Sequence, residues 1–157
     1  MKILLVAVGR PAHPDLRRAI RDYEERAGRY FDLQTVEVSA GGGAGTTDED
    51  VRRREGQRLL RRSSSSGTRF ALTRQGKTMT SRSLAKAIDR ARTYTPDGLA
   101  FLVGGAHGLS SRVLDEADHA LSLSTFTLPH ELARLVLVEQ LYRAGTILRG
   151  EPYHKER

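Results

Sequence analysis

The sequence predicts an α/β domain of three layers, in which helices cover both faces of a mostly parallel sheet. Two observations support this fold class. Short apolar runs, each long enough for one strand, alternate along the chain with apolar residues at helical spacing. The 157 residues, 38% of them hydrophobic, suit one domain with its own core, so we expect a single domain over residues 1–157. The candidate strands are residues 3–8, 33–38, 69–73, Leu99–Val103 and 120–124.

The first two expected helices begin at residues that favour a helix start. Pro14 suits the first turn of a helix that follows the first strand, with His13 or Pro11 before it. Thr47 suits an N-cap, and the acidic residues 48–50 behind it favour the positive end of the helix dipole.

The later helices have similar start signals. Thr80 or Ser81 caps the third helix and Ser110 caps the fourth. The last helix runs from Pro129 to about Leu148. Its apolar residues crowd more than one face, which agrees with burial on two sides, although an ordinary two-sided core helix has the same pattern.

A glycine-rich turn follows the most apolar strand. Gly104, Gly105 and Gly108 come directly after Leu99–Val103, and glycine lets a ligand approach the backbone amides closely. The uncharged segment 125–130 follows the next strand, so the two would form an uncharged pocket at the carboxyl ends of two strands. The same glycines would serve equally well as an ordinary turn between a strand and a helix.

Several other kinds of site are disfavoured. The glycine spacing is GGxxG with no following acid, unlike a dinucleotide site, and the GKT of residues 76–78 has Ala71 where a phosphate loop needs glycine. The chain has no cysteine, and its five histidines lack ligand spacing, so we expect no metal. The apolar run 3–8 is too short for a membrane span, and we expect a cytoplasmic protein.

The charge of the chain favours a polyanionic partner. The formal net charge is +7 and the pI is near 10.2, a balance that favours nucleic acid first and anionic lipid second. Arg54, Arg58 and Arg61 form one stripe of the second helix. The stripe suits contact with phosphates, but a merely solvated helix face explains it at least as well.

The chain resembles a known family in motifs spread over nearly its whole length. That family is the ribosomal RNA large-subunit pseudouridine N3-methyltransferases, which belong to the SPOUT class of knotted S-adenosylmethionine enzymes. Matched order and spacing over so many segments is more specific than any single motif. The matching segments are LLVAVG (4–9), GK (76–77), LVGGAHGLS (102–110), LSLS (121–124), TLPH (127–130), LVLVEQLYRA (135–144) and PYH (152–154).

The resemblance implies an activity and a set of site residues. The activity is S-adenosyl-L-methionine-dependent methylation of N3 of a pseudouridine in the intersubunit stem-loop of 23S rRNA, on the assembled 70S ribosome. The catalytic candidates that it implies are His130, Arg143, Tyr153 and His154. The implied donor-binding residues are Leu72, Gly104, Gly105, Gly108, Leu123, Ser124, Thr125, Phe126, Thr127 and Leu128.

The resemblance also implies features that the residues alone do not predict. It implies a homodimer with catalytic pockets at the subunit junction. It further implies a deep C-terminal trefoil knot near residues 100–150, which topology rules argue against. Because a tail as polar as residues 149–157 has no packing reason to carry Pro-Tyr-His, we expect it to close over the target base.

The chain departs from the family pattern at two positions. The family turn usually carries an acid where this chain has His107, and an aromatic residue is common where this chain has Gly145. Glycine inside a helix costs about 1 kcal/mol relative to alanine. Two rival functions remain open: a non-catalytic RNA- or ribosome-binding protein of the same fold, and a nucleotide-dependent enzyme of the ordinary doubly wound type.

Overall fold

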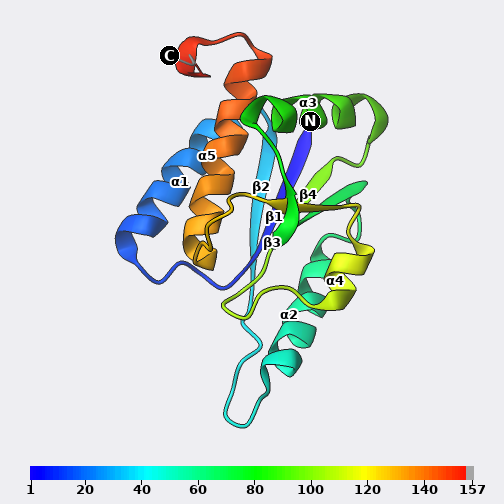
Figure 1. Cartoon of the computed structure of the whole chain (residues 1–157). Helices are drawn as coiled ribbons and strands as arrows, with labels where there is room; N and C mark the ends of the chain where they lie inside the picture. Colours follow the sequence, from blue (N-terminus) through cyan, green and yellow to red (C-terminus); the bar gives the residue numbers. More distant parts are fainter. Residues whose placement is uncertain (155–157) are drawn as a thin grey trace.

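The computed structural model describes residues 1–154 and shows a three-layer α/β/α fold around a parallel sheet of five strands (Figure 1). The strands are β1 (Lys2–Val8), β2 (Asp32–Val38), β3 (Thr68–Thr78), β4 (Leu99–Val103) and β5 (His119–Ser122). The helices are α1 (Pro14–Gly28), α2 (Asp48–Arg62), α3 (Ser81–Tyr94), α4 (Ser111–Glu116) and α5 (His130–Leu148), followed by a single 3-10 turn, Pro152–His154. The predicted fold class is confirmed.

The sheet has the strand order β2-β1-β4-β3-β5, and every pair of neighbours is parallel. Side chains alternate between the two faces of a strand, so the apolar run of β1 contributes to two separate core clusters. Ile3 and Leu5 belong to the cluster that includes buried residues of α1, α3 and α5. Leu4 and Val6 belong to the cluster under α2 and α4. This two-sided burial explains why β1 and β4 are continuously apolar.

The helices begin where the local signals predicted. His13, Thr47, Thr80 and Ser110 are N-caps, and each side chain accepts a hydrogen bond from a backbone amide of the first turn. α5 is preceded by Pro129, which makes no side-chain cap. The five predicted starts are thus confirmed, and the structure selects His13 over Pro11 and Thr80 over Ser81.

Two strand boundaries differ from the prediction by more than one residue. β3 extends to Thr78 instead of ending at residue 73, and Leu121 of β5 pairs with both Leu72 and Lys77 of β3. β3 therefore flanks β5 twice, with residues 73–76 crossing between. A Cβ on Gly76 would lie 2.6 Å from backbone carbons of β5, so this crossing requires glycine.

β5 ends at Ser122, two residues before the predicted end at 124. The Ser122 hydroxyl donates to the Ser124 carbonyl at 2.9 Å, and the Phe126 amide donates to the Ser124 hydroxyl at 2.9 Å. These local bonds turn the chain away from the sheet.

The long helix α5 packs against both α1 and α3 on one face of the sheet (Figure 1). Val138 and Leu141 are buried, whereas Leu132, Leu135 and Val136 are only partly buried. The trefoil knot stays a prediction. Among the described residues, no helix is both long and apolar enough to cross a membrane.

Candidate functional site

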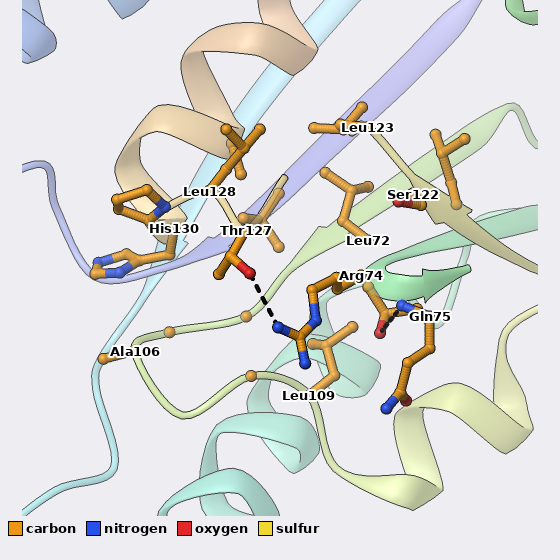
Figure 2. Close-up of a pocket in the computed structure, with 18 of the residues that line it drawn as sticks. Leu72, Arg74, Gln75, Ala106, Leu109, Ser122, Leu123, Thr127, Leu128 and His130 are labelled. Carbon is orange, nitrogen blue, oxygen red and sulfur yellow. Dashed lines mark hydrogen bonds between the residues drawn. The ribbon is translucent and has the colours of Figure 1, made fainter. Parts of the chain in front are cut away.

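A cavity of about 890 Å³ lies at the carboxyl ends of β4 and β5, against the middle of β3 (Figure 2). Its walls come from residues 72–75 of β3, from the turn after β4, and from the segment that joins β5 to α5. All the predicted donor-binding residues line it except Thr125. The lining members of that prediction are Leu72, Gly104, Gly105, Gly108, Leu123, Ser124, Phe126, Thr127 and Leu128.

The turn after β4 is tight enough to require glycine. The Gly108 amide donates to the Gly105 carbonyl at 3.1 Å, and Gly108 has φ +79°. A Cβ on Gly104 would lie 2.9 Å from the carbonyl carbon of Gly108. The glycines therefore fold the turn back on itself at the cavity wall.

A buried carboxylate supports this turn from behind. Glu55 of α2 is 3% exposed, and its Oε1 accepts a hydrogen bond from the Gly41 amide at 3.0 Å. Its Oε2 has no partner among the described residues and would lie 3.0 Å from a Cβ on Gly105. Glu55 thus contacts both the glycine loop 40–46 and the cavity turn.

The expectation of an uncharged pocket is wrong at its rim. Arg52, Arg74 and His107 line the cavity, together with Gln75. The Arg74 guanidinium points into the cavity, and its Nη1 donates to the Thr127 hydroxyl at 2.9 Å (Figure 2). Arg74 therefore links the middle of β3 to the loop that leads into α5.

His107, where the resemblance leads us to expect an acid, pairs with a carboxylate from another element. Its Nδ1 lies 3.3 Å from Oδ1 of Asp48, the first residue of α2. The Arg52 Nη1 donates to the His107 carbonyl at 3.4 Å. An acidic group is thus still present beside the turn, supplied by α2.

Two of the predicted catalytic residues cluster away from the cavity. Arg143 pairs with Glu139 at 2.7 Å, and the Tyr153 hydroxyl donates to Oε1 of the same Glu139 at 3.1 Å. The Arg143 guanidinium lies over the Tyr153 ring, 4.8 Å from its centroid. Burial, followed by hydrogen bonding with Tyr23 and the charge of Glu139, raises the pKa of Tyr153 well above its ordinary value. Tyr153 therefore remains a hydrogen-bond donor at neutral pH.

The predicted catalytic residues thus form two groups within one chain. His130 lines the cavity at the start of α5, whereas Arg143 is thirteen residues further along the helix. At 1.5 Å per residue the separation is roughly 20 Å. Figure 1 shows the tail at the opposite end of α5 from the loop that enters it. The His154 side chain and residues 155–157 lie outside the described part of the chain.

Comparison with known proteins identifies the family. The family model described as "Predicted SPOUT methyltransferase" matches residues 1–154. The chain belongs to the SPOUT methyltransferase family. A protein of Gemmatimonas aurantiaca named Ribosomal RNA large subunit methyltransferase H is 46% identical over 155 residues, which are 99% of this chain and all of that protein. A protein of Halothermothrix orenii with the same name is 38% identical over 159 residues, again 99% of this chain and all of that protein.

Solved structures show the same fold at low sequence identity. A methylase family protein of Haemophilus influenzae has a TM-score of 0.57 at 12% identity, covering 99% of this chain and 70% of that chain. A structure described as a putative methyltransferase of Legionella pneumophila in complex with the bound cofactor SAM has a TM-score of 0.53 at 13% identity. It covers 90% of this chain and 65% of that chain.

Sequence reasoning missed Glu55, Arg74 and Arg52. Glu55 had a usable signal, because it shares one face of α2 with the apolar Val51 and Leu59 at four-residue spacing. Arg74 had none, because its place depends on the path of residues 73–76 around β5. Within residues 1–154, no group of three or more His, Cys, Asp or Glu is arranged to hold a metal ion.

Proposed function

We propose that this protein is an S-adenosylmethionine-dependent methyltransferase of the large-subunit ribosomal RNA. The observation that carries the proposal is the cavity at the end of the sheet, which gathers residues from three distant segments of a SPOUT chain. Full-length relatives named as rRNA large subunit methyltransferases support the choice of substrate.

The cavity fits the three chemical parts of this donor. Leu72, Leu123 and Leu128 offer an apolar slot for the adenine, and the amides of the glycine turn offer hydrogen bonds beside it. Arg74 offers a guanidinium to the amino acid carboxylate. When bound, S-adenosylmethionine supplies an activated methyl group, so this chain mainly has to align the acceptor with it.

We further propose that the acceptor is N3 of a pseudouridine in the intersubunit stem-loop of 23S rRNA, in the assembled 70S ribosome. This nitrogen carries a proton at neutral pH that must leave before or during transfer. His130 lies at the cavity and is available to accept it. The protonated Tyr153 and the cationic Arg143 suit the stabilisation of the negative charge that develops on the ring.

The separation of these residues supports a homodimer. Arg143 and Tyr153 lie too far from the cavity of their own chain to act there, so we propose that they serve the cavity of a second copy. The partly buried Leu132, Leu135 and Val136 of α5 offer an apolar surface for that contact. Each pocket would then be completed by the tail of its partner.

Methyl transfer to ribosomes tests the proposal. Purified protein is incubated with S-adenosyl-[methyl-³H]methionine and either 70S ribosomes, 50S subunits or protein-free rRNA from cells that lack this enzyme. We expect label in 23S rRNA from 70S ribosomes, and mass spectrometry of nuclease fragments to place it on one pseudouridine. If calorimetry shows that S-adenosylmethionine does not bind to the purified protein, the proposal is contradicted.

The non-catalytic alternative has a distinct outcome. A protein that binds ribosomes with unchanged affinity whether or not S-adenosylmethionine is present, and transfers no label, would be an RNA-binding protein of the same fold. If label appears in protein-free rRNA as readily as in 70S ribosomes, rRNA methylation stands and only the proposal that the substrate is the assembled 70S ribosome is contradicted.

A further inference from the structure

A second cavity, of about 580 Å³, lies under α3 at the edge of the sheet. Phe70 of β3 and His119, the first residue of β5, form its floor, and α3 forms its wall. It shares none of its described lining residues with the donor cavity. His119 is three residues before Ser122 at the donor cavity, a separation of roughly 10 Å along an extended strand. The two cavities are therefore different sites.

The wall of this second cavity carries uncompensated positive charge. Lys86 and Arg90 are exposed and lie one helical turn apart on α3. Among the described residues neither forms an ion pair, because the nearby Asp89 pairs with Arg92 at 3.0 Å. Asp118, next to the floor, accepts a hydrogen bond from the Arg69 amide at 2.8 Å. The site therefore attracts an anion.

Aromatic rings lie beside these cations. Tyr94, at the end of α3, is 78% exposed, so packing within the chain does not explain it. The exposed His119 ring lies 4.7 Å from the Phe70 ring, centroid to centroid. Phe70 is itself fixed by stacking on Phe101 at 5.1 Å. Tyr94 and His119 thus both line the cavity, one from the end of α3 and the other from the start of β5, and the His119 ring packs against Phe70.

We propose that this cavity, the α3 groove, binds an unpaired nucleotide segment of RNA. Cations that contact phosphates, next to aromatic rings that stack on bases, are the features by which proteins bind single strands. Here Lys86 and Arg90 contact the phosphates, and Tyr94 and His119 stack on the bases. The proposal rests on the proposed function, in that the substrate is RNA, and it adds a contact remote from the reacting atoms. An acidic peptide would explain the cations and leave the exposed rings without a role.

Binding of a fluorescein-labelled ten-nucleotide uridine oligomer, followed by anisotropy at several salt concentrations, tests the proposal. For the double variant Lys86→Gln and Arg90→Gln, the slope of log K against log salt should fall in magnitude by about 1.4, because each single-strand phosphate contact contributes about 0.7. Tyr94→Ala should weaken binding by about tenfold with no change in slope, and Tyr94→Phe should restore it.

Matched controls distinguish a loss of RNA binding caused by the groove residues from one caused by lower net charge or by misfolding. The double variant Arg18→Gln and Arg21→Gln removes the same charge from exposed positions of α1 and should leave the salt slope unchanged. Calorimetric binding of S-adenosylmethionine should be equal in all variants, because none of these residues lines the donor cavity. Equal loss in the α1 variant would overturn the proposal, since net charge alone would then explain binding.

Three further outcomes would also overturn it. They are unchanged binding by the Tyr94→Ala variant, equal affinity for a duplex of the same length, and a change of oligomeric state in the groove variants on light scattering. The last would show that the groove contacts a second copy of the chain. Wild-type protein that binds the oligomer without methylating 23S rRNA would contradict the proposed function and leave the groove standing.

Discussion

The contact between Gly145 and Tyr30 links the packing of α5 to the C-terminal tail that follows this helix. A Cβ on Gly145 would lie 2.4 Å from Cγ and 2.6 Å from Cβ of Tyr30, so the Tyr30 side chain occupies the space that any larger residue at position 145 would need. The Tyr30 hydroxyl donates to the Glu151 carboxylate, and the Arg149 guanidinium lies 4.6 Å from the centre of its ring. The hydrogen bond with Glu151, followed by burial, raises the pKa of Tyr30 to about 12. Tyr30 therefore holds the start of the tail.

Gly145→Ala should destabilise the protein, although alanine is the better helix former. Alanine gains about 1 kcal/mol of helix propensity. Overpacking against a fixed ring costs about 1–3 kcal/mol. We expect a net loss of about 1 kcal/mol, which for a chain of this size lowers Tm by about 2–4 °C. Because the displaced Tyr30 also holds Glu151, methylation should fall further than stability does.

Thermal denaturation of a small variant set measures this effect. Gly28→Ala, at the end of α1, is the matched control, because a Cβ there has no neighbour within 4 Å and should not lower Tm. Combining Gly145→Ala with Tyr30→Gly should cost less than the sum of the two single changes, because glycine lacks the Cβ and Cγ atoms of Tyr30 that a Cβ at position 145 would meet. A Gly145→Ala variant with a raised Tm would refute the packing argument.

Three other predictions follow from the site and its supports. Deletion of residues 150–157 should abolish methylation and leave calorimetric donor binding unchanged; retained turnover would contradict a catalytic tail. Arg74→Ala should weaken donor binding by about tenfold, because a charged hydrogen bond is worth about 1.5–3 kcal/mol, whereas Arg112→Ala, outside the cavity, should not. Although burial acts in the opposite direction, hydrogen bonds from Arg134 and Arg10 hold the pKa of Glu37 below its ordinary 4.5. Its folded pKa is thus lower than its unfolded one, so its stabilising contribution is present above about pH 4.5 and is lost as pH falls through the folded value. Tm should therefore decline in acid, and a Glu37→Gln variant with an equally steep decline would contradict this.

Much of the fold could be predicted because its signals are local. The caps at His13, Thr47, Thr80 and Ser110 depend on hydrogen bonds within a few residues, and sequence spacing contains that information. The motifs of the family likewise predicted most of the cavity wall. The ends of β3 and β5 were wrong because they depend on how the two strands cross, and that is a contact between distant segments.

By itself, the sequence determined the alternation of strands and helices, the helix starts, the basic charge and the family. Only the tertiary structure placed Arg74 across the cavity against Thr127, and Glu55 behind the turn. It also showed that Tyr30 fills the space above Gly145, and that Arg143 and Tyr153 lie far from His130. The physical reason is the same in each case. Hydrogen bonding within a turn and hydrophobic periodicity along one segment are encoded locally. The position of a charged side chain, the space left beside a glycine and the distance between two site residues depend on which remote segments the packed core brings together.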